Sequence, residues 1–319
     1  MAFSKNILSE QTIRTISAKA FPDKNIASIN ELNQGCCNTL YVLEYEDGFK
    51  SILKVAPADK TCHTKNEANL MKTEAKALNF ILGKISVKTP EVYFYDDSLT
   101  DCASSYIFME YIPGETYEAI EKSLSKEEKE RIDYKTGKMV KELTDITSDK
   151  FGFLGDDEHQ FDTLCEFFEY LLNNVISDAE EKQIDYTISK NELLELFEKD
   201  RRCFEYMEQP CLVHFDMNQE NILVVDKEVV GLVDWDKTIF GEPMMEERFR
   251  LQKYTLAFFE GFRQSQFNYR ETRRLLWYDA LFYLSKMCEC RFRGCEDESI
   301  YSNALQFFKQ SLAMLQISF

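Results

Sequence analysis

Three polar residues in the C-terminal half of the chain have the types and the spacing that phosphoryl transfer needs. Asn221 directly precedes a strand-like run at 222–225, and Asp234 directly follows a second run at 229–233. Because a short polar turn joins the two runs into a hairpin, antiparallel pairing brings both side chains to its open end. Asp216 lies in the loop that leads to this end. Three oxygen ligands in one cleft suit Mg²⁺ together with a phosphate ester.

The same residues belong to a longer pattern. His214-Phe215-Asp216 is followed by four residues and then Asn221, and the apolar hairpin ends in Asp234. This arrangement matches the H-x-D-x4-N catalytic loop and the metal-binding Asp of the protein-kinase fold. Taken singly, each residue suits a structural role in a turn, at a strand end or in the core. The joint match favours catalysis.

A phosphoryl-transfer site also needs a cation for the nucleotide phosphates, and the N-terminal part of the chain offers Lys54. Two strand-like runs at 39–45 and 49–55, separated by an Asp-Gly turn, predict a hairpin with Lys54 on its second strand. Over 66–84 the apolar residues recur at helical spacing, and Glu74 lies on the apolar face. A carboxylate placed there needs a cation, so the sequence predicts a Lys54–Glu74 ion pair that positions the ammonium on the phosphates.

With these residues identified, the sequence resembles the aminoglycoside phosphotransferase family, a small-molecule branch of the kinase-like fold that also contains choline, homoserine and fructosamine kinases. The resemblance covers most of the chain. It rests on Gly35-x2-Asn38, Lys54, Glu74, Met109 to Gly114, His214 to Asn221, Gly231 to Trp235, and Gly241-Glu242-Pro243 followed by Glu246. Two positions depart from the family pattern, which usually has Gly at Phe215 and often has His at Asp145-Ile146. Phe215 either lines the acceptor pocket or fills core space.

The resemblance implies a role for each matching residue. Asp216 would be the catalytic base or hydroxyl-orienting residue, while Asn221 and Asp234 would hold Mg²⁺. The implied ATP-binding residues are Gly35, Asn38, Lys54, Glu74, Glu110 and Ile112. Lys54 would bind the α and β phosphates and be held by Glu74. Backbone groups of Glu110 and Ile112 would bind the purine edge.

The resemblance also implies an α+β, two-lobed, protein-kinase-like fold. Residues 1–110 would form an N-terminal nucleotide-binding lobe with a small antiparallel sheet and a helix. Residues 111–319 would form a larger, mainly helical lobe for catalysis and acceptor binding, after the break at Pro113-Gly114. Segments 162–202 and 246 onward would wall the acceptor pocket, and their acidic residues would favour an amine-bearing alcohol. Glu247 would contribute if it lines the pocket, whereas Glu246, which matches the family's acidic position after Gly-x-Pro, either lines the pocket or has a structural role.

Composition excludes several partner classes. The 319 residues include 38 Lys plus Arg and 56 Asp plus Glu, a net charge of -18 that repels nucleic acid and anionic lipid. The chain has no apolar run of the roughly 20 residues that cross a bilayer, and residues 1–24 carry no secretory pattern. We therefore expect a cytoplasmic protein with reduced thiols. Cys288, Cys290 and Cys295 lack the spacing of common zinc sites.

The predicted function is an ATP- and Mg²⁺-dependent phosphotransferase that acts on a hydroxyl of a small molecule, an aminoglycoside-like antibiotic or an amino alcohol. The alternatives are a metabolite kinase of the sugar, choline or homoserine type, and a nucleotide-binding pseudokinase that acts as a regulator. A protein kinase is disfavoured because only six residues separate Asp234 from Gly241 and the chain has no G-x-G-x-x-G or A-P-E. The full set of site residues argues against a pseudokinase.

Overall fold

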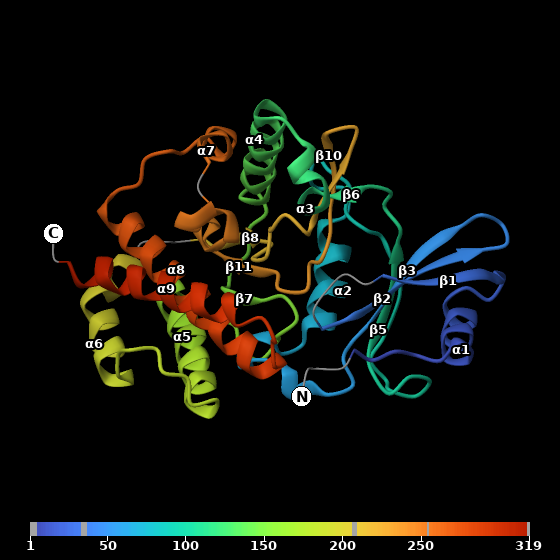
Figure 1. The fold of residues 1–319 in the computed structure, drawn as a ribbon, viewed down its shortest axis with the longest axis horizontal. Helices are drawn as coiled ribbons and strands as arrows, with labels where there is room; N and C mark the ends of the chain where they lie inside the picture. The colour runs from blue at the N-terminus through green and yellow to red at the C-terminus, as the bar shows by residue number, and fades with distance from the viewer. Residues whose placement is uncertain (1–4, 33–36, 206–208, 254, 318–319) are drawn as a thin grey trace.

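The computed structural model describes residues 5–32, 37–205, 209–253 and 255–317. A sheet with one flanking helix occupies one end of the molecule, and most of the helices gather at the other (Figure 1). Within the described residues, no helix is long and apolar enough to cross a membrane. The arrangement confirms the expected α+β fold, with a small antiparallel sheet beside a mainly helical region.

The N-terminal sheet has five antiparallel strands in the order β1-β2-β3-β5-β4. Their bounds are β1 Ile26–Leu32, β2 Thr39–Tyr45, β3 Lys50–Val55, β4 Val92–Asp96 and β5 Tyr106–Glu110. The predicted hairpin is confirmed, because Thr39 pairs with Val55 and Glu44 with Lys50. Its turn uses Gly48 at φ +81°, a left-handed conformation that suits glycine.

The two faces of this sheet serve different purposes. Helix α1 (Glu10–Ala20) covers one face and buries Ile13 and Ile16 in a separate apolar cluster with Leu43 and Phe108. Helix α2 (Leu70–Ile81) belongs instead to the main core of the molecule. The sheet and α2 thus place their polar groups at the junction between the N-terminal sheet region and the mainly helical region.

Helix α2 is shorter than the predicted span of 66–84. A capping box between Thr64 and Glu67 closes a 3₁₀ turn at Lys65–Glu67, and Asn69 adopts a left-handed conformation at φ 62° before the helix begins. The helical spacing therefore starts four residues later than the apolar pattern suggests. Its buried face includes Glu74, as predicted.

The second predicted hairpin is also confirmed. Strands β9 (Ile222–Val225) and β10 (Glu228–Leu232) pair antiparallel, with Ile222 opposite Leu232. Strand β6 (Glu115–Thr116) adds to the edge of β9. A further small sheet, in the order β7-β11-β8, comprises β7 Gly152–Phe153, β8 Cys211–Val213 and β11 Ile239–Gly241.

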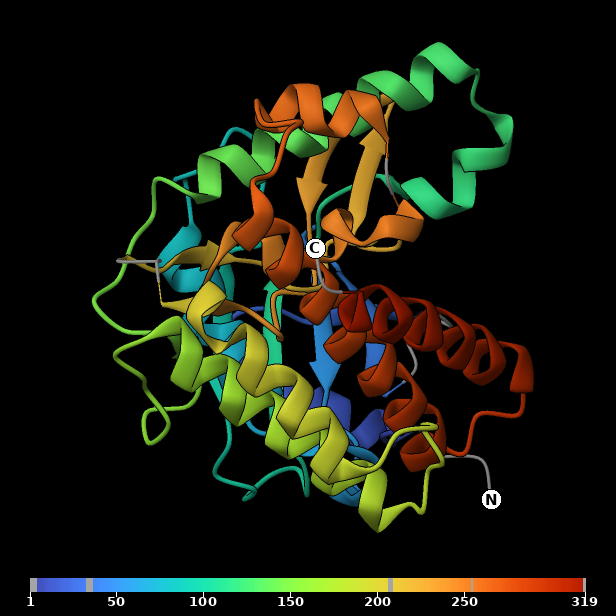
Figure 2. The same cartoon turned by 90° about the vertical axis from the view of Figure 1, so that its left-hand side faces the viewer.

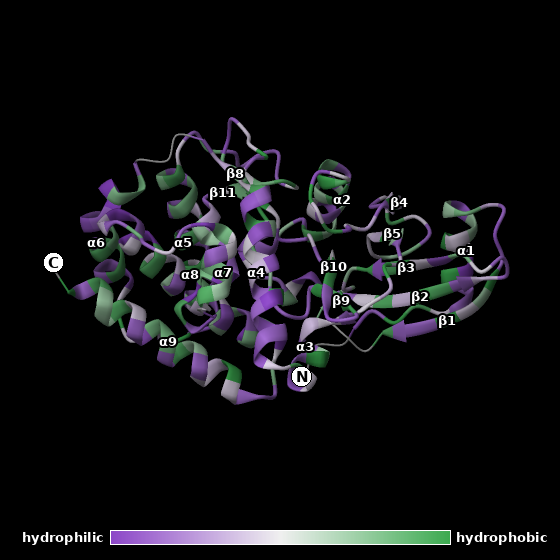
Figure 3. Cartoon of the chain, turned by 90° about the horizontal axis from the view of Figure 1, so that it is seen from above, coloured by the Kyte–Doolittle hydropathy of each residue, from purple (hydrophilic) through white to green (hydrophobic). Residues whose placement is uncertain are grey.

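Helices form the rest of the mainly helical region (Figures 1 and 2). They are α3 Tyr117–Ile120, α4 Lys126–Leu143, α5 Leu164–Glu181, α6 Lys190–Asp200, α7 Leu256–Phe262, α8 Tyr269–Arg293 and α9 Glu298–Gln316. Hydrophilic residues dominate α4 (Figure 3), whose first turns face solvent. Its contact with α7 needs glycine, since a Cβ on Gly137 would lie 2.0 Å from the carbonyl oxygen of Phe258.

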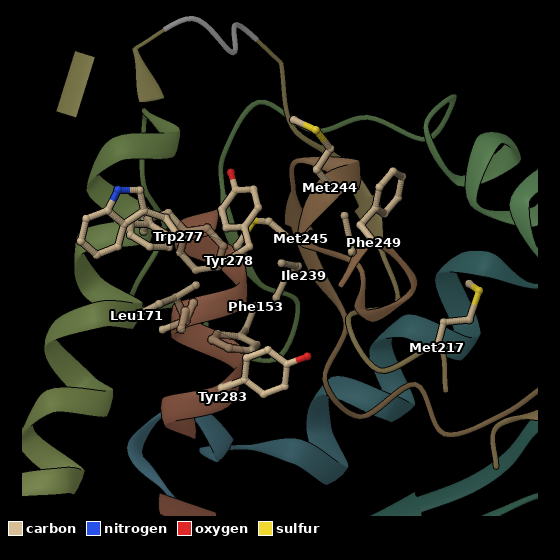
Figure 4. Close-up of a cluster of buried hydrophobic side chains, with 14 of the residues drawn as sticks. Phe153, Leu171, Met217, Ile239, Met244, Met245, Phe249, Trp277, Tyr278 and Tyr283 are labelled. Carbon is tan, nitrogen blue, oxygen red and sulfur yellow. The ribbon is translucent and has the colours of Figure 1, made fainter. Parts of the chain in front are cut away.

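Helix α8 is held in place by aromatic packing and buried ion pairs. Trp277 and Tyr278 lie in the main core with Phe153 and Met245 (Figure 4). Arg274 forms a buried ion pair with Glu242 at 2.6 Å, and the Tyr278 hydroxyl donates to the same carboxylate at 2.5 Å. Because Glu242 follows β11, these bonds fix α8 relative to the loops at the strand ends.

Candidate active site

Lys54 lies at the centre of a group of carboxylates. Its Nζ atom is 2.7 Å from Glu74 Oε2, 2.5 Å from Asp234 Oδ1 and 3.1 Å from Asp236 Oδ2. The predicted Lys54–Glu74 ion pair is therefore present, and both side chains are buried. We call Lys54, Glu74, Asp234 and Asp236 the lysine cluster. It joins strand β3 and helix α2 to the segment that follows β10.

Burial sets the protonation chemistry of the lysine cluster. Burial raises the pKa of Glu74 to about 7, although Lys54 opposes the shift. Burial would by itself lower the pKa of Lys54, but the carboxylates around it, Asp234 foremost, raise that pKa well above its usual range. Lys54 therefore remains a cation, which is the form that binds phosphates.

Asp236 is a member of the cluster that sequence reasoning missed. Oxygen atoms of Glu74, Asp234 and Asp236 lie within 4.8 Å of one another, a spacing that fits a metal ion. Of the three, Asp234 is the most accessible, with 38% of its side chain exposed. The signal was the Asp-x-Asp spacing after β10, which places two carboxylates on one short loop.

Asp216 and Asn221 lie on a loop that is tied to the start of the Asp234 segment. His214 is fully buried, with its Nε2 3.0 Å from the carbonyl oxygen of Val233, and the amide of Val233 donates to Asn221 O at 3.0 Å. The side-chain amide of Asn221 donates to Asp216 O at 2.8 Å, which leaves Asn221 Oδ1 as its ligand atom. These bonds bring together the three residues that the hairpin geometry predicted.

Glu246 holds the same loop from the other side. Its carboxylate accepts from the amide nitrogens of Phe215 at 3.0 Å and Met217 at 2.9 Å, and it is fully buried. Neither Glu246 nor Glu247 is among the residues that line the pocket beside Asp216, and both are buried, Glu247 in a pair with Lys253. Glu246 has the structural role that its match to the family's acidic position also allowed. A carboxylate that satisfies two loop amides is a positioning group rather than a substrate contact.

Phe215 explains why this position favours glycine. Its backbone has φ 70°, in the left-handed region that costs a non-glycine residue about 1 kcal/mol. The phenyl ring packs against the core edge-on to Phe153, with ring centroids 6.4 Å apart. Phe215 thus fills core space and also lines the pocket beside Asp216.

A small pocket of about 60 Å³ adjoins Asp216, and we call it the α8 pocket. Its lining residues are Thr64, Asn66, Glu67, Phe153, Leu171, Phe215, Asp216, Lys237, Met245, Tyr278, Leu281, Phe282, Ser285, Lys286 and Glu289. Helix α8 contributes more of the lining residues than any other element, and it lies within the segment from 246 onward. Segment 162–202 contributes Leu171 alone.

The charges around Asp216 keep it ionised. Lys237 Nζ lies 3.9 Å from Asp216 Oδ2. Burial favours the neutral acid, but Lys237 and Lys286 outweigh it and hold the pKa of Asp216 well below its usual range. The structure places Lys237 next to the predicted catalytic carboxylate.

The remaining predicted nucleotide contacts are placed in part. The Asn38 amide donates to Asp236 Oδ2 at 3.4 Å, so it borders the lysine cluster. The amide nitrogen of Glu110 already donates to Glu91 O at 2.8 Å, which leaves its carbonyl oxygen as the candidate for the purine edge. Ile112 is buried. Gly35 lies outside the described residues.

Solved structures with the same fold include aminoglycoside phosphotransferases. A streptomycin-ATP-APH(2")-IIa ternary complex matches with a TM-score of 0.60 and 19% identity, over 98% of this chain and 100% of that chain. A mutant APH(4)-Ia in ternary complex with ADP and hygromycin B matches with a TM-score of 0.68 and 15% identity, over 97% and 100%. At such identities the likeness establishes the fold.

Two sequence comparisons complete the picture. A search of curated proteins finds no match to this chain. The profile of the Phosphotransferase enzyme family matches residues 28–273, which include every described residue of the lysine cluster and the Asp216 loop. The chain therefore belongs to the Phosphotransferase enzyme family.

Proposed function

We propose that this protein is an ATP- and Mg²⁺-dependent kinase that phosphorylates a hydroxyl group of a small molecule. The observation that carries the proposal is the position of the Asp216 loop, which the His214–Val233 bond ties to the end of β10, beside the lysine cluster. Two sets of groups thus meet there, one suited to phosphates and metal, the other to a hydroxyl. Nucleotide-bound relatives of the same fold support ATP as the donor.

The net charge of the lysine cluster supports a role for Mg²⁺. One ammonium lies among three carboxylates, so the cluster has an excess of negative charge. Hard oxygen donors in excess fit a divalent cation, and Asp234, Asp236 and Asn221 Oδ1 would hold it. Bound there, Mg²⁺ would neutralise charge on the phosphates. Lys54, kept in place by Glu74, would bind the α and β phosphates.

Asp216 would face the acceptor hydroxyl. In the reaction, the acceptor oxygen forms a bond to the γ phosphorus, the bond from that phosphorus to the departing ADP oxygen breaks, and Asp216 accepts the hydroxyl proton. A strongly ionised carboxylate is a weak base, and this suffices because the transition state of phosphoryl transfer is loose. Its main contribution would be to orient the hydroxyl.

Two acceptor classes remain in view. The relatives are aminoglycoside phosphotransferases, which favours an aminoglycoside-like compound or an amino alcohol. The second class is a metabolite alcohol, and the small size and mixed charge of the α8 pocket favour it.

A pseudokinase that acts as a regulator has less support as a function. The residues that catalysis needs, Lys54, Glu74, Asp216, Asn221 and Asp234, are all present.

The proposal is tested by measuring Mg²⁺-dependent ATP consumption with aminoglycosides, other hydroxylated antibiotics, choline, amino alcohols, sugars and hydroxy acids. Asp216→Asn serves as the blank. We expect one class to give turnover that Asp216→Asn lowers by about 100-fold or more, with Mg-ATP affinity nearly unchanged. A chain that binds Mg-ATP but shows no turnover above the blank with any class would be a regulator instead.

A further inference from the structure

The charge balance of the α8 pocket narrows the acceptor class, an inference that rests on the proposed function. Three carboxylates, Glu67, Asp216 and Glu289, face the pocket. Three cations lie close to these carboxylates. Lys237 and Lys286 line the pocket, and Arg293 contacts Glu67 and also Glu289, the latter at 3.1 Å. The pocket has no surplus of negative charge, although the whole chain has a net charge of -18.

The carboxylates are already engaged by these fixed cations. Glu289 lies 3.4 Å from Lys237, 3.1 Å from Lys286 and 3.1 Å from Arg293. An incoming ammonium group would have to displace a lysine or an arginine to reach it. A polycationic acceptor would therefore lose as many ion pairs as it forms, and the like charges would repel it.

Lys286 is the cation best placed to bind a ligand. Its described ion pair is with Glu289 alone, whereas Lys237 lies within 4 Å of three carboxylates. An ammonium has three donors, so Lys286 can offer donors beyond the one directed at Glu289. About a third of its side chain, 31%, is exposed, against 17% for Lys237. Burial disfavours its charge, but Glu289 raises the pKa of Lys286, which stays protonated.

The walls and the volume of the pocket limit the size of the ligand. Phe215, Tyr278, Leu281 and Phe282 supply apolar surface around the charged groups. The space is about 60 Å³, far below the roughly 300 Å³ at which ordinary drug-sized ligand pockets begin. A small molecule with one charged group and a hydroxyl fits these walls better than a polycyclic one.

We propose that the acceptor is a small hydroxylated anion, with Lys286 binding its carboxylate or phosphate group while Asp216 faces its hydroxyl. Lys286 is then the residue that sets specificity. Asp216 and Lys286 line the same pocket from opposite elements, the loop after β8 and helix α8. Anion and hydroxyl would accordingly be close together in the acceptor.

The first experiment compares hydroxylated acceptors of different charge. D-glycerate and glycerol 3-phosphate are the anionic probes, glyceramide and glycerol are the neutral ones, and serinol and kanamycin are the cationic ones. We expect phosphorylation of at least one anion, with kcat/KM about tenfold or more above its neutral partner. The carboxylate and phosphate arms show which anion is preferred. A preference for kanamycin, serinol or the neutral alcohols would overturn the inference while leaving the kinase proposal intact.

The second experiment uses Lys286→Gln, with the exposed Lys309→Gln as the matched control. We expect Lys286→Gln to raise the KM for the anionic acceptor about tenfold or more, to change kcat less, and to leave Mg-ATP affinity unaltered. Calorimetry with Mg-AMP-PNP bound measures glycerate and glycerol 3-phosphate binding directly, so the result does not depend on turnover. The inference is refuted if neither anion binds, or if wild type and Lys286→Gln bind the anion equally well. Loss of Mg-ATP binding by the wild type would instead refute the proposed function.

Discussion

On the side of the site that faces the sheet, one lysine lies among three carboxylates, whereas on the side that faces α8 three cations answer three carboxylates. The lysine cluster carries an excess of negative charge that an incoming cation would balance. In the α8 pocket, the two lining lysines together with Arg293 behind them balance the three carboxylates. Under the proposed function, the metal and the nucleotide would therefore bind on the sheet side only. The difference also shows that the carboxylates of one pocket can be paired with cations even when the whole chain is strongly acidic.

The largest predicted effect is that of Asp234→Asn on the binding of Mg-ATP. The change removes one negative charge and a ligand atom from the lysine cluster at almost constant volume. We expect Mg-ATP binding to weaken by about 100-fold or more, while metal-free ATP binding weakens little, because Lys54 remains. Calorimetry with and without Mg²⁺ measures both quantities. The control is Asp157→Asn, an exposed carboxylate that pairs with Lys72 and Lys76; equal weakening by both variants would contradict the assignment.

A second test concerns stability and uses Lys54→Met. Removing the ammonium leaves Glu74 and Asp236 buried without their cation, so we expect the free energy of unfolding to fall by about 3 kcal/mol. Adding Glu74→Gln should restore part of this loss but not nucleotide affinity. Urea unfolding and calorimetry provide the two measurements. If Lys54→Met is as stable as the wild type, the lysine cluster does not depend on that charge.

The smallest predicted effect concerns pH and uses Lys237→Met. Lys237 favours the ionised form of Asp216, so its removal raises the pKa of that carboxyl. Asp216 then becomes protonated at a higher pH, so the acid limb of the kcat/KM profile shifts to higher pH. The activity lost relative to wild type should be greater at pH 5 than at pH 8. A profile displaced equally at all pH values would show that Lys237 acts in another way.

Stability should respond less to Lys237→Met than to Lys54→Met. The carboxylates that Lys237 contacts keep other cations, since Glu289 retains Lys286 and Glu67 retains Arg293. The difference between the two losses of unfolding free energy therefore measures how much more the lysine cluster depends on its one lysine than the α8 pocket depends on Lys237.

Much of the site could be predicted from local sequence. The H-x-D-x4-N spacing and the strand ends at Asn221 and Asp234 follow from hairpin pairing, which depends on neighbouring residues. The Lys54–Glu74 pair was predicted because a carboxylate on the apolar face of a helix requires a cation. The sequence also predicted the order of sheet and helices through its resemblance to the family.

The role of the acidic residues after the Gly-Glu-Pro motif was decided by tertiary packing. The sequence left open whether Glu246 lines the pocket or has a structural role, and in the structure Glu246 is fully buried and accepts from the amides of Phe215 and Met217 in an earlier loop. Glu247 is likewise buried beside Lys253. Burial depends on which elements cover a residue, and spacing along the chain does not report that.

The sequence by itself determined which groups could carry out phosphoryl transfer, because strand alternation and helical spacing are local and leave a readable pattern. Only the tertiary structure decided the charge of the acceptor side. Glu67, Lys237 and Arg293 come from three separate segments, and their ion pairs depend on how α8 packs against the loops. Coulomb interactions act through space, so the pocket became neutral through contacts between residues up to 226 positions apart.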